Sequence, residues 1–373
     1  MYFGLNDEQK MLAQTARRFV EKECPSSKVR QIMQTENAYD VELWQKMATN
    51  GWLGLTVPEE YGGMGESWLT VLALFEELGR GIVPGPLLAT VGLAVPTLVA
   101  AGNADQKARW LPTIAEGGCR ATVAYLEPTN SYALDTITTE ARHLTDNNYS
   151  LSGSKMFVLD ANVADIIIVS AKDSDDAALG LFLVEKGAAG LTVENLEGMD
   201  LTRRLTRLTL ANTPAQKLDG TNDAKGALTA ALQRASFVLS AEGIGGIRWI
   251  IDTSVAYAKT REQYGRLIGS YQAVAHPLVD RMLELTSSTS ALYNAAYALD
   301  ERPGEVAEAV SLAKAQTSDS YRQAGYTGVQ THGGIGFTWE HDMQLYFRRG
   351  SASWSLFGDP PYHREQMLRL MEV

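Results

Sequence analysis

The chain contains little cysteine and no long apolar run, and both shortages narrow the class of protein it can be. Only two cysteines, Cys24 and Cys119, occur in 373 residues, and their separation matches no metal-ligand spacing. Such cysteine usage is typical of a reducing compartment. No apolar stretch is as long as a membrane-spanning helix, and no basic and apolar leader opens the sequence. We therefore expect a cytoplasmic protein with no bound metal and no membrane partner.

Basic residues are also in short supply. The 33 lysines and arginines are outnumbered by 44 aspartates and glutamates, which gives a formal net charge of −11. Surfaces that bind nucleic acid are positively charged, so the composition argues against a nucleic-acid partner. The hydrophobic content of 45% is ordinary for a globular protein, and the length suits two or three packed units.

The period of the hydrophobic pattern changes twice along the chain. Residues 1–120 and 224–373 follow a helical period, whereas residues 121–223 alternate with a period of two. Short strands without intervening helices predict a closed or nearly closed antiparallel barrel, and long consecutive helices predict a bundle. We therefore expect an α+β fold with three domains: an N-terminal helical domain, a middle antiparallel β-barrel domain and a C-terminal antiparallel four-helix bundle.

The individual elements follow from the same pattern. Helices are expected over residues 7–24, 41–50, 68–80, 105–115, 227–260, 274–299, 305–329, 342–353 and 362–371. Strands are expected over residues 122–125, 137–142, 149–154, 156–159, 166–171, 179–184, 191–196 and 208–211. Pro84, Pro86 and Pro96 predict an irregular connection between the helices on either side of them.

A glycine-rich segment at residues 330–341 is the most informative stretch of the chain. Gly333, Gly334 and Gly336 occupy three of four consecutive positions directly after a helical pattern. Glycine leaves no side chain to block a ligand, so backbone N–H groups here could hold the pyrophosphate of a nucleotide. A helix C-cap followed by a turn uses the same glycines. The segment alone fits both interpretations.

A second glycine-containing segment, at residues 257–272, favours the ligand-binding interpretation of residues 330–341. The two segments, at this separation, resemble those of the acyl-CoA dehydrogenase family of flavoproteins. Further matches occur in the same order at residues 51–63, 76–80, 126–128 and 151–158. The resemblance extends from about residue 3 to about residue 370 and implies the family's three-domain fold.

The resemblance implies an activity, a cofactor and partners. The expected reaction is the FAD-dependent α,β-desaturation of an acyl-CoA thioester to the trans-2-enoyl-CoA. A carboxylate base removes the α proton while the β hydride passes to flavin N5. An acyl-CoA is the expected substrate and an electron-transferring flavoprotein the expected redox partner. Part of the cofactor site in this family comes from a neighbouring subunit, so a homo- or hetero-oligomer, a dimer of dimers, is expected.

The resemblance also assigns cofactor-binding residues. Arg261 is expected to face the flavin pyrophosphate, although a solvated arginine at a helix end would have the same sequence context. The remaining cofactor-binding residues are Tyr125, Leu126, Phe157, Leu159, Tyr264, Gln272, Gln330, Gly333 and Gly334. The residues of the strand segments also fit a purely structural role in the barrel core. Leu159 replaces the usual threonine, and residues 129–135 lack the usual glycines, so two flavin-facing segments depart from the family pattern.

Neither position that holds the catalytic glutamate in this family carries a carboxylate here, because they fall on Phe357 and Ala235. Glu242 lies seven residues after Ala235, on the same face of the helix and about 10 Å away. Its apolar surroundings would raise its pKa, as suits a proton-abstracting base. A buried structural glutamate paired with an arginine such as Arg248 explains the residue equally well.

Asp359 is a second candidate for the base. It lies two residues after Phe357, but Pro360 and Pro361 stiffen the backbone that would have to carry it inward.

Two functions fit these departures from the pattern. The first is an active enzyme with a relocated base, similar to the bacterial branch that acts on bulky acyl-CoAs in fatty acid or steroid degradation. The alternative is a non-catalytic partner subunit of a heteromeric acyl-CoA dehydrogenase, which contributes part of a shared FAD site. The altered loop at residues 129–135, Leu159 and Phe357 favour the alternative. Arg261 and the motif at residues 330–336 favour retained contact with the cofactor.

Overall fold

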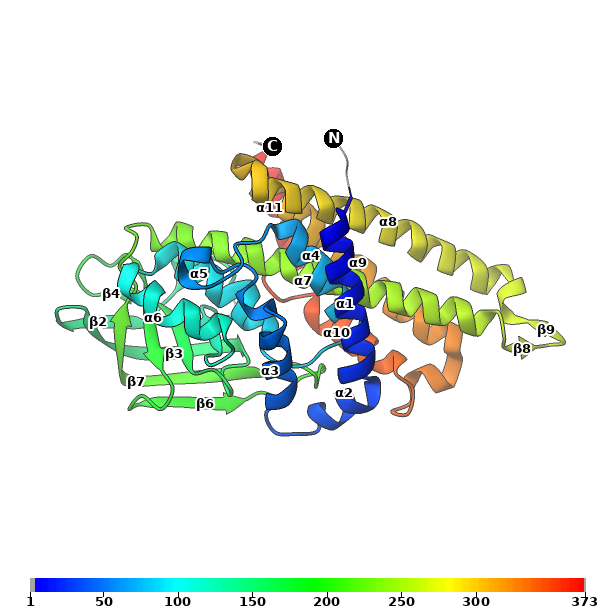
Figure 1. Cartoon of the computed structure of the whole chain (residues 1–373), viewed down its shortest axis with the longest axis horizontal. Coiled ribbons are helices and arrows are strands. Elements are labelled where there is room, and N and C mark those ends of the chain that lie inside the picture. The colour runs from blue at the N-terminus through cyan, green and yellow to red at the C-terminus, as the bar shows by residue number, and fades with distance from the viewer. Residues whose placement is uncertain (1–3, 130, 372–373) are drawn as a thin grey trace. The chain divides into compact units, whose positions relative to one another are not determined.

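A computed structural model describes residues 4–129 and 131–371 of the chain, which divides into two compact units (Figure 1). The helical unit comprises Met1–Arg30, Ser67–Val83 and Ser236–Val373, and the barrel unit comprises Gln31–Glu66 and Pro84–Ala235. Each unit therefore joins segments that are distant in the sequence. The predicted domain boundaries at residues 120 and 223 stay a prediction.

The helical unit is built from long helices. Its elements are α1 (Asp7–Glu23), α4 (Trp68–Arg80), most of α7 (Ala224–Ala258), α8 (Gln272–Glu301), α9 (Val306–His332), α10 (Met343–Ser353) and α11 (Pro360–Leu370), with the hairpin β8 (Glu262–Gln263) and β9 (Arg266–Leu267) and the short turns η5 (Ile268–Ser270), η6 (Pro303–Glu305) and η7 (Gly333–Phe337). Helix α9 packs against α8, α10 and α11. This arrangement confirms the predicted C-terminal bundle.

Side-chain caps fix where several of these helices begin. Asn6 and Gln9 form a capping box at the start of α1, and the Ser67 side chain accepts a hydrogen bond from the backbone of Thr70 in α4. Asp359 caps α11, which begins with a proline. Each cap satisfies a backbone N–H that the helix itself leaves unpaired.

Helix α7 approaches its neighbours at glycines. A Cβ atom on Gly79 of α4 would lie 2.1 Å from the carbonyl oxygen of Glu242, and one on Gly245 would lie 1.9 Å from that of Glu76. A Cβ atom on Gly246 would lie 2.3 Å from the hydroxyl of Tyr321 in α9. The backbones of α7 and α4, and the Tyr321 side chain beside Gly246, leave no space for even a methyl group, so the glycines set the separation of α7 from α4 and α9.

Replacing Gly79 with alanine is expected to destabilise the helical unit. The added methyl must push α4 away from α7, and overpacking of this kind costs about 1–3 kcal/mol. A lowered Tm in thermal denaturation would show the effect. The matched control is Gly304→Ala, because no atom lies within 4 Å of the position of a Cβ there. Equal Tm values for the two variants would contradict this account of the crossing.

The barrel unit carries the sheet and the remaining helices. Its elements are part of α2 (Ser26–Met33), α3 (Val41–Thr49), η1 (Trp52–Gly54), η2 (Glu59–Tyr61), the π-helix η3 (Leu88–Ala94), α5 (Val95–Ala101), α6 (Ala104–Ala115), η4 (Leu134–Thr136), and strands β1 (Ala121–Ala124), β2 (Glu140–Thr145), β3 (Asn148–Leu159), β4 (Ile166–Asp173), β5 (Leu179–Glu185), β6 (Leu191–Asn195) and β7 (Leu205–Lys217). Strands β2, β3, β4, β6 and β7 are labelled in Figure 1.

Five strands close the barrel. Strand β4 pairs with β5, β5 with β7, β7 with β3, β3 with β2, and β2 with β4 again. Strand β1 adds to β4, and β6 adds to β7. The predicted barrel is confirmed, and all of its pairings are antiparallel except β1–β4 and β2–β4, which are parallel.

Burial along the strands explains the barrel. Strand β7 alternates buried and exposed residues, as expected for a strand with one face toward water. Strand β4 is buried at nearly every position, which matches its continuous apolar run. The barrel core includes Leu151, Val169, Phe182 and Leu208.

The predicted helices all occur, but two helical stretches were not anticipated. Helix α2 follows α1 directly, and residues 88–101 form η3 and α5 where a proline-punctuated connection was expected. Pro96 lies in the first turn of α5, directly after the π-helix η3. Among the described residues, no helix is both long and apolar enough to cross a membrane.

Candidate functional site

Two of the predicted flavin-binding segments lie together in the barrel unit. Tyr125 and Leu126 follow the end of β1 and are buried. The backbone N–H of Met156 in β3 donates to the carbonyl oxygen of Leu126 at 2.9 Å. The sequence separates these segments by thirty residues, and the fold joins them by this hydrogen bond.

Strand β3 is irregular where it meets Leu126. Its pairing with β7 shifts between Lys155 and Val158, and Phe157 within this bulge has a φ of 55° and is 38% exposed. A bulge redirects a side chain that would otherwise follow the alternation of the strand. Leu159 is instead buried, and its carbonyl accepts a hydrogen bond from the hydroxyl of Thr122. Phe157 is therefore the residue of this pair whose side chain a ligand can reach.

A buried ion pair holds these segments in place. The Nζ of Lys155 lies 2.8 Å from a carboxylate oxygen of Glu127 and 3.5 Å from the carbonyl oxygen of Tyr125. The Glu127 carboxylate also accepts four hydrogen bonds of 2.6–2.8 Å from the backbones and hydroxyls of Thr138 and Thr139. The ion pair and its hydrogen bonds hold the end of β1 through Tyr125 and the end of the following loop through Thr138 and Thr139.

The charge states of this pair follow from its surroundings. Burial favours the neutral acid, but the hydrogen bonds from Lys155, Thr138 and Thr139 outweigh it and lower the pKa of Glu127 to about 2. Burial lowers the pKa of Lys155 to about 8 despite the neighbouring carboxylate. Removing one partner of a buried ion pair leaves the other charge buried and unpaired, which strongly destabilises a protein. We therefore assign Glu127 and Lys155 a structural role.

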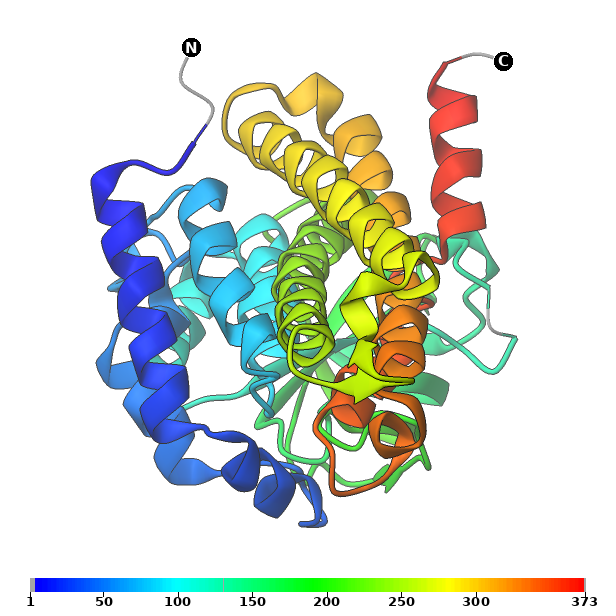
Figure 2. The same ribbon diagram turned by 90° about the vertical axis from the view of Figure 1, so that its right-hand side faces the viewer.

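In the helical unit, the ends of α7 and α9 lie side by side, and Figure 2 looks onto this end of the helices. The rings of Tyr257 and His332 stack with centroids 4.6 Å apart. Arg261 follows α7, and its backbone N–H donates to the carbonyl oxygen of Tyr257 at 2.9 Å. Gly333 follows His332 and caps α9. The stacked rings therefore bring the hinge of Arg261 close to the glycine segment.

The start of α8 belongs to the same cluster. Tyr271, which precedes Gln272, packs with Tyr257 and Ile268 in a small hydrophobic core. All the predicted cofactor residues at this end are exposed in the single chain: Arg261, Tyr264, Gln272, Gln330, Gly333 and Gly334. Tyr264, at the tip of the hairpin, is 94% exposed. The predicted cofactor residues of this unit are therefore accessible to a ligand.

The glycine segment has room for a ligand. Gly333 has a φ of 66°, a conformation that side chains rarely adopt, and no atom lies within 4 Å of the position of a Cβ on Gly333 or Gly334. The open backbone suits an extended anionic group such as a pyrophosphate, which backbone N–H groups and the Arg261 guanidinium would hold. The residues present therefore fit the phosphate part of a flavin dinucleotide.

The two candidate bases differ in their surroundings. Glu242 is 7% exposed and lies at the crossing of α7 with α4. Arg248, the arginine suggested as its partner, instead pairs with Glu76 through a contact of 2.8 Å. Asp359 accepts the backbone N–H of Tyr362 at 2.8 Å as the cap of α11. Of the two candidates, Glu242 is buried, and Asp359 is half-buried and caps α11.

The residue at the position of the missing base lies in a tight turn. Phe357 has a φ of 60° and Gly358 a φ of 108°, so both have the positive φ that residues other than glycine rarely adopt. Beneath the turn lie Lys314 and His363, both buried, which the sequence interpretation overlooked. A lone lysine among the alanines of the buried face of α9 was the signal that could have revealed Lys314.

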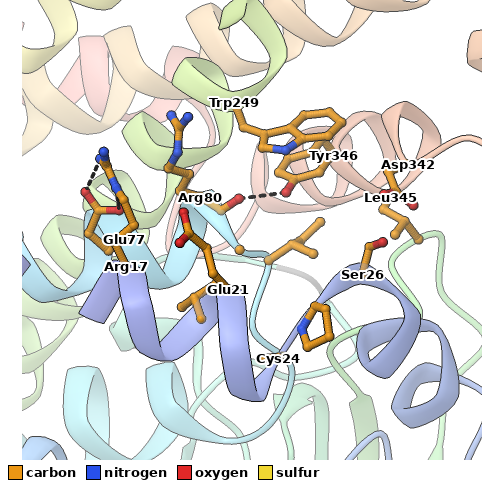
Figure 3. Close-up of a pocket in the computed structure, with 14 residues that line it drawn as sticks. Arg17, Glu21, Cys24, Ser26, Glu77, Arg80, Trp249, Asp342, Leu345 and Tyr346 are labelled. Carbon is orange, nitrogen blue, oxygen red and sulfur yellow. Dashed lines mark hydrogen bonds and ion pairs between the residues drawn. The ribbon is translucent and has the colours of Figure 1, made fainter. Parts of the chain in front are cut away.

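A separate polar cavity of about 380 Å³ lies between α1, α4 and α10 (Figure 3). Arg17 binds Glu77 there through two hydrogen bonds of 2.9 and 2.7 Å, and the hydroxyl of Tyr346 donates to the carbonyl oxygen of Arg80 at 2.6 Å. No predicted site residue lines this cavity. Arg17, Glu77, Arg80 and Asp342 of its lining are in ion pairs within the protein, so we assign the cavity no part in the chemistry.

Comparison with known families gives three consecutive matches. Residues 6–118 match the acyl-CoA dehydrogenase N-terminal domain, residues 122–212 the acyl-CoA dehydrogenase middle domain, and residues 225–371 the acyl-CoA dehydrogenase C-terminal domain. Together the three matches span nearly the whole chain.

Similar proteins align over their full length. Acyl-CoA dehydrogenase IpdE2 of Mycolicibacterium smegmatis is 31% identical over 367 residues, which cover 98% of both chains. A solved variant of the Tcur3481–Tcur3483 steroid ACAD is 29% identical with a TM-score of 0.89, covering 98% of both chains. The ChsE4–ChsE5 complex from Mycobacterium tuberculosis is 25% identical with a TM-score of 0.91, covering 100% of this chain and 99% of the other.

Proposed function

This chain belongs to the acyl-CoA dehydrogenase family and is an oxidoreductase of that type, and from this we propose that it desaturates a bulky acyl-CoA with FAD as cofactor. The observation that supports the proposal is the stack of Tyr257 on His332, which joins the ends of α7 and α9, together with the exposure of Arg261, Gln272 and Gly333 near these helix ends. Such guanidinium, amide and backbone N–H groups can donate hydrogen bonds to the phosphates of a flavin dinucleotide.

The chain's own residues would divide the work. Arg261 and the backbone of Gly333 and Gly334 would bind the pyrophosphate, and Phe157 in the bulge of β3 would contact the ring. When bound, the flavin supplies the acceptor for the hydride. Glu242 would take the α proton, and Asp359 is the second candidate. An electron-transferring flavoprotein would reoxidise the enzyme, as the family resemblance implies.

An oligomer completes this proposal. The cofactor residues at the end of α7 and α9 are exposed in the single chain, together with apolar side chains such as Tyr264 and Phe337, which is 70% exposed. Exposed apolar groups beside a binding site are typical of surfaces that a second chain covers. We propose a dimer of dimers in which a neighbouring subunit covers the cofactor.

A bulky substrate is favoured by Phe357 and by the relatives. Phe357 places a large apolar ring, beside Gly358, at the position where the family usually has the catalytic glutamate. Such a replacement changes the shape of an acyl site. One of the similar structures is described as a steroid ACAD. We propose substrates of that size class.

One observation also favours the alternative function, a non-catalytic partner subunit with part of a shared FAD site. Neither Phe357 nor Ala235 can accept a proton, so both usual positions of the base are empty of carboxylates. One of the similar structures is a complex of two named chains, ChsE4 and ChsE5. In such an assembly the base would come from the other chain.

The visible spectrum of the purified chain tests the proposal. A chain that is yellow alone and is bleached by an acyl-CoA supports the active enzyme. A chain that turns yellow only with a co-expressed paralogue supports the partner subunit. Arg261→Ala is expected to weaken flavin binding by about 10- to 100-fold through the loss of charge-assisted hydrogen bonds, whereas the exposed Arg18→Ala should not. A protein that is colourless in both settings would overturn both functions.

A further inference from the structure

A buried cation lies beneath the turn that carries Phe357. Lys314 in α9 is 1% exposed, and its Nζ donates to the hydroxyl of Ser318 at 2.8 Å. The same Nζ also lies 3.1 Å from the carbonyl oxygen of Gly358, 3.3 Å from that of Trp354 and 3.4 Å from that of Ser353. A buried charge is costly unless its hydrogen bonds are satisfied. Here the acceptors are main-chain carbonyls of a single turn, residues 353–358.

A buried histidine holds the same turn from α11. His363 is 5% exposed, and its Nε2 lies 3.2 Å from the carbonyl oxygen of Phe357. Its Nδ1 lies 3.3 Å from the hydroxyl of Ser311. Burial, together with the nearby Lys314 cation, lowers the pKa of His363 to about 3, so the ring is neutral. A neutral ring that donates from Nε2 to Phe357 accepts at Nδ1 from Ser311.

The backbone of the turn is strained where it is held. Phe357 keeps a φ of 60°, and a Cβ on Gly358 would lie 2.5 Å from the ring of Tyr362 and 2.8 Å from the Nε2 of His363. A bulky residue with positive φ persists only where the surrounding structure over-determines it. Lys314 and His363 supply that constraint, because they bind four of the carbonyls in the turn.

We propose that Lys314 and His363 are positioning residues that fix the 353–358 turn so that Phe357 forms a rigid wall of the acyl site and selects the acyl chain. The inference rests on the proposed function, because it takes Phe357 to lie where the family places its base. The wall is rigid because the carbonyl groups of Phe357 and Gly358 are both tied to buried side chains. A Phe357 ring in a fixed position excludes acyl chains whose shape does not fit beside it. A ring on a mobile turn could move aside and admit them.

The charge of Lys314 makes the wall sensitive to pH. Burial lowers the pKa of Lys314 to about 7, against the opposing effects of Asp359 and Asp319. The facing His363 is neutral in this range. The ammonium form below pH 7 binds carbonyls more strongly than the amine above it. Selectivity between acyl chains should therefore be greatest below pH 7 and should decline as the pH rises through about 7.

The test compares Lys314→Met with the wild-type holoenzyme, purified in whichever assembly holds flavin. The matched control is Lys22→Met, because the Lys22 side chain is 82% exposed. Flavin content, Tm, and kcat and KM are measured for a steroid-sized and a short straight-chain acyl-CoA across pH. Lys314→Met is expected to keep its flavin, to change the ratio of the two kcat/KM values by about 10-fold or more, and to lose the pH dependence of that ratio.

A second variant keeps the test decisive if Lys314→Met does not fold. His363→Leu removes the donor to Phe357 and leaves Lys314 in place, so it should change the same ratio in the same direction. An unchanged ratio in flavin-loaded variants would overturn the positioning role alone. A wild-type assembly that binds neither flavin nor acyl-CoA would overturn the proposed function and the inference with it.

Discussion

Replacing Glu242 with glutamine is expected to leave flavin bound and to slow its bleaching by an acyl-CoA by about 10²- to 10⁴-fold, the usual contribution of a general base. The side chain is 7% exposed on α7, so an amide of the same shape can occupy the space. The amide cannot accept the α proton. Rapid mixing with the acyl-CoA under anaerobic conditions measures the rate directly.

Two control variants separate chemistry from structure. Glu76→Gln removes a carboxylate from α4 that pairs with Arg248, so it should lower the Tm and leave bleaching intact. Asp359→Asn preserves the cap of α11, because asparagine caps as well as aspartate, and removes only the charge. Bleaching that is lost in Asp359→Asn and retained in Glu242→Gln would assign the base to Asp359. Bleaching retained in both would favour a base on another chain.

The fold was predictable from the sequence because its signals are local. A period of 3.6 over α1 and α4, the long apolar stretch of α7 and the alternation in β7 can each be recognised from neighbouring residues. The parallel pairing of β1 with β4 was not predictable, because strand order is set by contacts between distant segments. The bulge at Phe157 made one strand, β3, resemble two, since it breaks the alternation.

The candidate site was predictable only in part, because contacts between distant segments leave no local signal in the sequence. Arg261 and Gly333 stand out in the sequence as parts of motifs, but the stack of Tyr257 on His332 that joins them is a tertiary contact. The hydrogen bond from Lys314 to the carbonyl oxygen of Gly358 joins residues 44 positions apart, so no local sequence pattern predicts this contact. The sequence therefore identifies groups that can bind a ligand and misses the groups that position them.

Adding Phe357→Glu to the Glu242→Gln chain is expected to restore bleaching by a short straight-chain acyl-CoA by about 10-fold or more, since general base catalysis is worth about 10²–10⁴. The strained turn holds position 357 at a φ of 60° through Lys314 and His363, so a carboxylate placed there inherits a fixed position. The nearby ammonium of Lys314 favours the ionised form of the new acid, which is the form that accepts a proton.

The matched control for this rescue is Phe357→Gln in the same background, because glutamine has the size of glutamate and cannot act as the base. Rescue by glutamate alone would show that the turn still places its side chain at the reacting carbon. The bleaching rate with a steroid-sized acyl-CoA is a second measurement. It should respond differently from the rate with the short acyl-CoA, because both substitutions remove the Phe357 ring that we propose selects the acyl chain. If neither substrate is desaturated while flavin stays bound, position 357 lies away from the reacting carbon, and Phe357 then has no part in choosing the acyl chain.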